Sequence, residues 1–324
     1  MKLLRDVAGV PAELRSGAVA IGNFDGVHLG HARIVDRVIE KARELGSAAV
    51  VFTFDPHPVR ILRPSEAPPP LTWTDRKAEL LAELGVDFVI AYPTDEALLS
   101  LSPEEFFQRI VRQGLDARAL VEGPNFYFGR GRSGTIEVLR RLAGDAGISL
   151  DVVESLVVEG DIVSSSRIRR LIAEGDVAGA RALLTRPYRI RGMVVHGAGR
   201  GAKLGFATAN LDALDTLVPG AGVYAGCGSV AGRRFAAAIN VGPSPTFGEV
   251  GQRVEAHLLG WDGSPLYGQA LEVDFLSRLR KIERFSGADA LVAQLKKDVD
   301  AARKAFHQFE LADKLASAPR PGGG

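Results

Sequence analysis

The first half of the chain alternates short apolar segments with segments of helical periodicity, and this alternation constrains the fold more than any other feature. Ser102 is expected to cap one of the helices. Strands are predicted at 18–22, 48–54, 87–92 and 119–123, and helices at 31–45, 76–84 and 103–113. This rhythm predicts an α/β fold with a mostly parallel sheet and helices on both faces. Ligands of such sheets bind beyond the C-terminal ends of the strands.

The second half has a different character, because short strand-like runs are separated by glycine. A helix–turn–helix is predicted around 174–188 and ends at Pro187. The strand-like runs lie at 189–197, 222–230, 233–242, 253–261 and 270–276. Closely spaced strands with turn residues between them predict a small antiparallel β-barrel. An amphipathic terminal helix is predicted from about 287.

The length of 324 residues suits two domains better than one. We expect a first domain over 1–182, a second over 183–312 and a disordered tail over 313–324. Formal net charge is +1, from 40 basic and 39 acidic residues, so no long-range field attracts nucleic acid or an anionic membrane. We therefore expect neither partner, and phosphate binding must be local.

Cys227 is the only cysteine, which excludes an intramolecular disulfide and a cysteine-based zinc site. No apolar run is long enough for a membrane span, and residues 1–14 hold no long apolar stretch of the kind found in signal peptides. The chain is therefore expected to be cytoplasmic, as a monomer or a weak homo-oligomer.

The segment GNFDGVHLGH, residues 22–31, leaves a predicted strand and enters a predicted helix. Gly22 and Gly26 let the backbone turn tightly, and His28 and His31 are spaced so that both can face one ligand. The N-terminus of the helix adds free N–H groups and a positive dipole end, which favours phosphate. No GK[ST] follows, so this is not a Walker motif. Metal binding is a weaker alternative because no third ligand is apparent, and the histidines could also be structural.

The same segment closely resembles the HxGH signature of the nucleotidyltransferase superfamily. Its FDGVH wording resembles the prokaryotic bifunctional riboflavin kinase/FMN adenylyltransferases, also called FAD synthetases, and the resemblance continues over roughly 15–305. It implies an N-terminal Rossmann-like nucleotidyltransferase domain that adenylylates FMN, followed by a barrel domain that phosphorylates riboflavin. It also implies ATP as co-substrate, Mg²⁺ on the phosphates, and riboflavin, FMN and FAD as further ligands.

Two segments that follow predicted strands resemble the flavin-lining loops of that family, FTFDPHP at 52–58 and EGPNFYFGRGRSG at 122–134. An amide can bond the edge of a flavin ring, and an aromatic side chain can stack on it. Both segments could instead be rigid structural turns. The resemblance implies flavin contacts for Asp55, Pro56, His57, Pro58, Asn125 and Phe128.

The segment VSSSRIRRLI, 163–172, resembles the family's SSTRIR-like segment. Its serines precede a predicted helix and could simply cap it. The resemblance implies instead that this helix start and Arg167 hold the β- and γ-phosphates of ATP. Together with the first motif, the expected ATP and phosphate contacts of this half are Gly22, Asn23, Phe24, Gly26, Ser164, Ser165 and Arg167, with His28 and His31 stabilising the transition state.

In the second half, HGAGRGAKLGFATANL at 196–211 resembles the riboflavin kinase segment that ends in PTAN. Ala207 stands where the family has proline, so the loop is expected to be less rigid. The resemblance implies phosphate contacts for Gly201 and Lys203, and Mg²⁺ and ATP contacts for Thr208 and Asn210.

RVEAHLLGWDGSPLYG, 253–268, also resembles the kinase, and the resemblance makes Glu255 the general base for the riboflavin 5′-hydroxyl. The alternative for Glu255 is a solvent-facing side chain on an edge strand. Asn240 and Thr246 are weaker candidates for the same pocket.

Three alternatives stay open for the whole chain. Another HxGH nucleotidyltransferase could act on pantetheine phosphate, nicotinate nucleotide or a cytidylyl acceptor, although the second half speaks against it. One module, most plausibly the kinase because of Ala207, could be inactive. A flavin-binding or sensory protein without turnover is the third.

Overall fold

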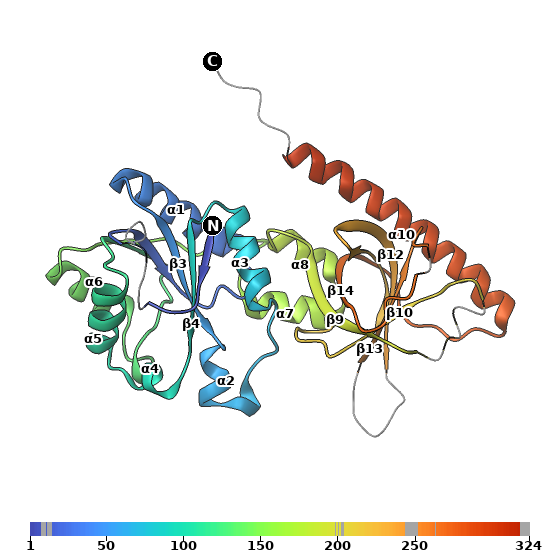
Figure 1. Ribbon diagram of the computed structural model, residues 1–324, viewed down its shortest axis with the longest axis horizontal. Helices are drawn as coiled ribbons and strands as arrows, with labels where there is room; N and C mark the ends of the chain where they lie inside the picture. The colour runs from blue at the N-terminus through green and yellow to red at the C-terminus, as the bar shows by residue number, and fades with distance from the viewer. Residues whose placement is uncertain are drawn as a thin grey trace, which may run out of the picture. The chain divides into compact units, whose positions relative to one another are not determined.

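The computed structural model describes residues 1–7, 11, 15–197, 199, 201, 204–243, 252–262 and 264–317. Lys203, Thr246 and residues 318–324 of the expected tail 313–324 lie outside these described residues. Two compact units divide the chain, Met1–Ser165 and Ser166–Gly324. The first contains a sheet flanked by helices and the second a barrel followed by a long helix (Figure 1).

A six-stranded sheet forms the first unit, in the order β1–β4–β3–β2–β5–β6. Every neighbouring pair in it is parallel, which confirms the predicted sheet. The strands are β1 (Lys2–Leu4), β2 (Ala18–Ile21), β3 (Ala49–Asp55), β4 (Phe88–Pro93), β5 (Ala119–Glu122) and β6 (Ser149–Val152).

Helices cover both faces of this sheet, because successive strand residues point to opposite sides. Along β2, Ala18 and Ala20 join the core under α1 and α3, whereas Val19 and Ile21 join the core under α5, η3 and α6. These helices are α1 (Leu29–Leu45), α3 (Thr74–Glu83), α5 (Pro103–Phe106), the π-helix η3 (Phe107–Gly114) and α6 (Ile136–Asp145). Smaller elements are α2 (Pro58–Leu62), η2 (Pro64–Glu66), α4 (Glu96–Ser100), η4 (Arg130–Arg132), and the antiparallel pair β7 (Val157–Val158) and β8 (Asp161–Ile162).

The strand order reverses between β2 and β5. These strands pair through Ala18–Ala119 and Val19–Leu120, and the Ile21 N–H then donates to the Glu122 carboxyl group at 2.8 Å. Open parallel sheets bind ligands at such a reversal, beyond the C-terminal strand ends. Segments 22–31 and 123–134 begin at this reversal, which is the place where a sheet of this kind would bind a ligand.

A closed six-stranded barrel forms the second unit, in the order β10–β13–β12–β11–β14–β9. All its strand pairs are antiparallel, as predicted. The strands are β9 (Tyr188–Val195), β10 (Ala209–Asp212), β11 (Gly222–Val230), β12 (Arg233–Pro243), β13 (Gln252–Leu258) and β14 (Ala270–Arg280). The predicted helix–turn–helix is α7 (Ser165–Glu174) and α8 (Val177–Leu183), and the terminal helix α10 (Ala288–Ser317) packs on β11, β12 and β14.

Some elements differ from the sequence analysis. Helix α1 begins at Leu29 rather than at 31, because His28 is its N-cap. Strand β10 was not predicted, since its sequence has little strand preference and its pairing with β9 and β13 is a tertiary effect. Helix α10 continues through Ser317, beyond residue 312, where the second domain was expected to end.

Candidate functional sites

The turn between β2 and α1 is fixed by side chains from other segments. Thr53 Oγ1 of β3 donates to the Asn23 carbonyl oxygen at 3.0 Å. The Gly26 N–H donates to Thr72 Oγ1 at 3.2 Å, and the Asp25 carboxylate accepts the Thr72 N–H at 3.0 Å. These contacts hold the backbone of residues 22–28 in one conformation. We call this segment the cradle.

The cradle contains backbone strain at two non-glycine positions. Phe24, Gly26 and Val27 have φ values of 46°, 83° and 39°. Glycine adopts a positive φ without cost, but for a β-branched valine it is a true outlier. Strain of this kind persists only where the surroundings enforce it, and it clusters at functional sites.

His28 and His31 form a reciprocal cap at the start of α1. The His31 N–H donates to His28 Nδ1 at 3.2 Å, and the His28 N–H donates to His31 Nδ1 at 3.3 Å. The two rings stack with centroids 3.6 Å apart and planes 14° apart. Because each Nδ1 accepts, each neutral ring carries its proton on Nε2 and presents that N–H as a donor.

Both imidazoles are neutral at pH 7. Burial lowers the pKa of His28 to about 4, against a smaller opposite effect of the Asp25 charge. Burial also lowers the pKa of His31 well below its ordinary value of 6.5, and the charges of His28 and Lys77 add to that effect. The first turn of α1 holds no acidic residue. The cradle therefore offers neutral donors and a positive helix end, which together suit phosphate.

The serine segment at the start of α7 contacts the cradle. Ser165 Oγ donates to the Asp25 carbonyl oxygen at 2.8 Å. A Cβ on Gly30 would lie 3.4 Å from the Val163 carbonyl oxygen and 3.1 Å from the His28 ring. The structure thus brings two of the predicted motifs together. Arg167 lies in the first turn of α7, within the second unit, and its phosphate role stays a prediction.

Residues of the first expected flavin loop are engaged in fixing that loop. Asp55 Oδ2 accepts from Thr74 Oγ1 at 2.7 Å, and the Asp55–Pro56 peptide bond is cis. His57 caps α2 by accepting the Val59 N–H at 3.2 Å. These contacts give the loop a defined shape at the C-terminal end of β3.

The second expected flavin loop follows β5. Asn125 is exposed there, whereas Phe128 is only 5% exposed and stacks on Phe126 with ring centroids 5.4 Å apart. Phe126 is more exposed than Phe128. The structure therefore offers Asn125 and Phe126 to a ligand more openly than Phe128.

Two buried ionisable residues close to the cradle were missed in the sequence. Lys77 is 8% exposed and Glu122 is 3% exposed. A signal existed for each. Lys77 lies three and four positions before the buried Leu80 and Leu81, on the apolar face of its helix. Glu122 ends a strand whose other residues are all apolar.

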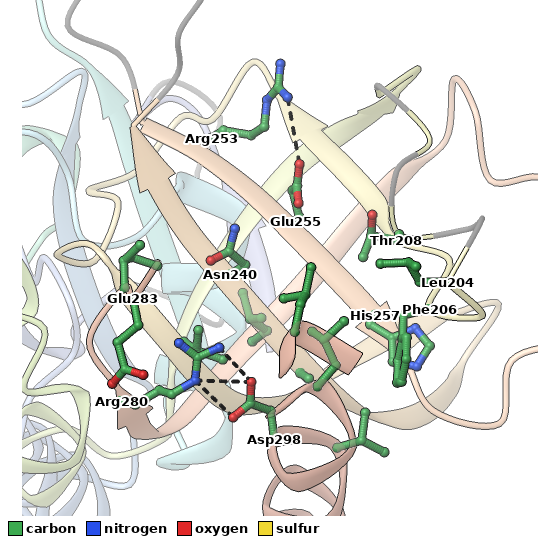
Figure 2. A pocket seen from close by; sticks show the side chains of 18 of the residues that line it. Leu204, Phe206, Thr208, Asn240, Arg253, Glu255, His257, Arg280, Glu283 and Asp298 are labelled. Carbon is green, nitrogen blue, oxygen red and sulfur yellow. Dashed lines mark hydrogen bonds and ion pairs between the residues drawn. The ribbon is translucent and has the colours of Figure 1, made fainter. Parts of the chain in front are cut away.

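A cavity of about 560 Å³ lies in the second unit, a size typical of small-molecule sites. Strands β10, β12 and β13 line it on one side, and the end of β14, the segment after it and α10 line it on the other (Figure 2). Glu255 pairs in register with Asn210 of β10 and with Asn240 of β12. Neighbours in register share a face, so these three polar side chains form a row in the cavity wall.

The polar row suits a general base beside a cation. The Glu255 side chain is 29% exposed, and its carboxylate lies 3.8 Å from Arg253 Nη1 (Figure 2). Asn210 Oδ1 is buried and has no hydrogen-bond partner in the part of the chain that the structure describes. An oxygen of this kind is a ligand that Mg²⁺ accepts, and Thr208 lines the same cavity. Among the described residues no cluster of three His, Cys, Asp or Glu side chains forms a metal site.

Hydrogen bonds restrain the glycine-rich loop beside this cavity, although Ala207 lacks the conformational restriction of a proline. His257 Nδ1 donates to the Ala207 carbonyl oxygen at 2.7 Å. The Phe206 N–H donates to the Gly201 carbonyl oxygen at 2.9 Å. A Cβ at Gly201 would lie 2.4 Å from the Phe206 oxygen, so only glycine fits there. These contacts restrain the part of the loop that the structure describes.

The described residues thus form a parallel sheet with a histidine pair at its strand reversal and a closed barrel with a carboxylate in its cavity, an architecture that suits a transferase with two modules. The family model for FAD synthetase matches residues 10–167, and that for riboflavin kinase matches residues 184–306. Among the helices of the described residues, none is both long and apolar enough to cross a membrane.

Curated relatives match along nearly the full length. The chain is 36% identical to the bifunctional riboflavin kinase/FMN adenylyltransferase of Pseudomonas fluorescens, in a match that covers 94% of this chain and 97% of the relative. It is 34% identical to the enzyme of the same name from Bacillus subtilis, in a match that covers 92% of this chain and 95% of the relative. A crystal structure from Streptococcus pneumoniae, titled a macrolide-efflux protein, matches with a TM-score of 0.83 at 29% identity, covering 93% of this chain and 98% of that one. The chain belongs to the bifunctional riboflavin kinase/FMN adenylyltransferase family, with the FAD synthetase domain first and the kinase domain second.

Proposed function

We propose that the chain phosphorylates riboflavin to FMN in the barrel cavity and then adenylylates FMN to FAD at the cradle, with ATP as co-substrate for both steps. The observation that carries the proposal is that each unit assembles its own polar constellation, His28 with His31 in one and Glu255 with Asn210 in the other. The boundary between residues 182 and 183 is part of the same proposal.

In the kinase step, Glu255 accepts the proton of the riboflavin 5′-hydroxyl while that oxygen attacks the γ-phosphorus of ATP. The bond from the γ-phosphorus to the bridging oxygen breaks, and ADP leaves. Asn210 and Thr208 would hold Mg²⁺, and the unpaired Asn210 Oδ1 supports this assignment. When bound, the ion neutralises phosphate charge. Gly201 and Lys203 are assigned to the phosphates of ATP.

In the adenylyl step, a phosphate oxygen of FMN attacks the α-phosphorus of ATP, the bond to the bridging oxygen breaks, and pyrophosphate leaves. The attacking group is already an anion, so no protein nucleophile or base is needed. Catalysis then depends on alignment and on donors aimed at the developing charge. The Nε2–H groups of His28 and His31 are those donors, acting as neutral groups rather than as cations.

The remaining contacts of the first unit complete the proposal. The helix start at Ser164 and Ser165, together with Arg167, holds the outer phosphates of ATP. Pro56, Pro58 and the loop after β5 contact the flavin. A cytoplasmic location and a monomeric or weakly associated state stay predictions.

Incubation of the purified chain with riboflavin, ATP and Mg²⁺, followed by chromatography, tests the proposal. Formation of FMN and FAD is expected. FAD made only from supplied FMN would mean an inactive kinase module, and neither product would favour another substrate or a protein without turnover.

A further inference from the structure

Lys77 is a buried cation that forms no ion pair among the described residues. Its side chain leaves α3 and is 8% exposed. Its ammonium donates to Thr53 Oγ1 at 3.2 Å, and among the described residues no carboxylate lies within ion-pair distance of it. An ammonium has three N–H donors, so this contact leaves donors available in a place that excludes water.

The preceding residue shows how the same helix treats a cation that serves structure. Arg76 is 6% exposed, and its guanidinium lies 3.0 Å from Glu79 and 3.9 Å from Glu83. A buried charge is normally compensated in this way, because removing it from water is costly. Lys77 lacks this compensation, although it lies one position away.

The nearest carboxylates are engaged elsewhere. Asp25 accepts the N–H groups of Leu71 and Thr72 at 3.0 Å, and Asp55 accepts from Thr74 at 2.7 Å. Their charges raise the pKa of Lys77, but the opposite effect of burial is larger and the pKa is lowered overall. The charge of Lys77 in turn contributes to the low pKa of His31, so the ammonium lies within electrostatic reach of the histidine pair.

Thr53 connects Lys77 to the cradle. Its hydroxyl accepts from the Lys77 ammonium at 3.2 Å and donates to the Asn23 carbonyl oxygen at 3.0 Å. A hydroxyl has one proton, so the lysine and the cradle backbone are held by opposite sides of the same group. Lys77 therefore lies beneath the turn that carries the two histidines.

We propose that Lys77 is a phosphate-binding residue of the FMN adenylylation site, whose ammonium donates its remaining N–H groups to an anionic phosphoryl oxygen held in the cradle. This inference rests on the function proposed above. The bound anion compensates the buried charge, and the fixed cation strengthens phosphate binding without reorganisation.

The test is the full-length Lys77→Met variant, which keeps the length and apolar stem of the side chain and removes its charge. FAD formation from FMN should fall by about 10²- to 10³-fold, the usual effect of losing one fixed electrostatic contact. FMN formation from riboflavin should not change. The melting temperature should stay the same or rise, because an unpaired buried charge is gone.

Arg76→Met is the matched control on the same helix. It removes a paired cation, so it should lower the melting temperature while folded protein keeps its rate of FAD formation. Calorimetry with inorganic pyrophosphate supplies a readout without turnover. Lys77→Met should lower the affinity for pyrophosphate by at least about tenfold relative to wild type, whereas Arg76→Met should leave it unchanged.

Two outcomes would overturn the inference. One is wild-type FAD formation and pyrophosphate binding in Lys77→Met. The other is a loss of activity that merely follows a loss of melting temperature, which would make Lys77 structural. If the wild-type chain makes no FAD from FMN, the proposed function itself fails, and that result is distinct from both.

Discussion

At the scale of single residues, His28 combines a structural role with a chemical one. Its Nδ1 caps α1 by accepting the His31 N–H, and its Nε2–H remains available to a ligand. The two roles can be separated, because asparagine is a good N-cap and alanine is a poor one.

His28→Asn and His28→Ala should both lower FAD formation from FMN by about 10²- to 10³-fold, since both remove the Nε2–H donor. Only His28→Ala should also lower the free energy of unfolding, by about 1 kcal/mol, because it removes the cap. Denaturant unfolding beside the assay checks this. Full activity in His28→Asn would show that His28 serves only as a cap.

Glu122 predicts a pH dependence of stability. Burial raises the pKa of its carboxyl group well above the ordinary value of 4.5. The folded chain therefore binds this proton more tightly than the unfolded chain, and stability is lost as pH rises from about 4.5 through the folded pKa. Glu122→Gln keeps an acceptor for the Ile21 N–H and removes the ionisation. Its advantage in unfolding free energy over wild type should grow with pH across that interval; parallel curves would contradict the assignment.

At the scale of elements, an ion pair fastens α10 to the barrel. The Arg280 guanidinium lies 2.8 Å from the Asp298 carboxylate, and the two side chains are 14% and 4% exposed (Figure 2). Removing one partner of a buried pair leaves an uncompensated charge, whereas replacing both with apolar residues does not.

Asp298→Ala should therefore lower the free energy of unfolding by about 3–5 kcal/mol. The double variant Arg280→Met/Asp298→Leu should recover most of that loss. Denaturant unfolding of the three proteins measures both effects. An equal loss in the double variant would mean that packing, rather than charge, holds α10 in place.

The glycine-rich loop gives a second prediction for an element. His257→Ala removes the hydrogen bond to the Ala207 carbonyl oxygen. The KM for ATP in the kinase step should therefore rise by about 3- to 10-fold, as expected for the loss of one hydrogen bond. FAD formation from FMN should not change. A steady-state KM for ATP measured in both reactions checks this, and an equal change in both would contradict it.

The elements also show which parts of the fold and of the sites can be predicted from the sequence. The strand–turn–helix around His28 is local, so periodicity and glycine placement predicted its strand and helix, whereas the phosphate site stays a prediction. The row of Asn210, Glu255 and Asn240 depends on the register of three strands distant in sequence, which periodicity does not encode. Lys77 was missed because its amphipathic helix was interpreted only through its apolar residues.

At the scale of the whole molecule, the chain divides into two compact units, and the two proposed sites share no residue. Each unit has its own core and its own polar constellation. A substitution in one site should therefore leave the chemistry of the other unchanged, apart from the supply of FMN.

Product chromatography with Glu255→Gln and His28→Asn tests this claim most directly. Glu255→Gln should make little FMN from riboflavin but should convert supplied FMN to FAD at the wild-type rate. His28→Asn should make FMN at the wild-type rate but convert it to FAD about 10²- to 10³-fold more slowly. Mixing the two variants should restore FAD formation from riboflavin, because FMN released by one can be used by the other. If each folded variant lost both reactions, or the mixture made no FAD although each variant kept its own step, two independent sites would be contradicted.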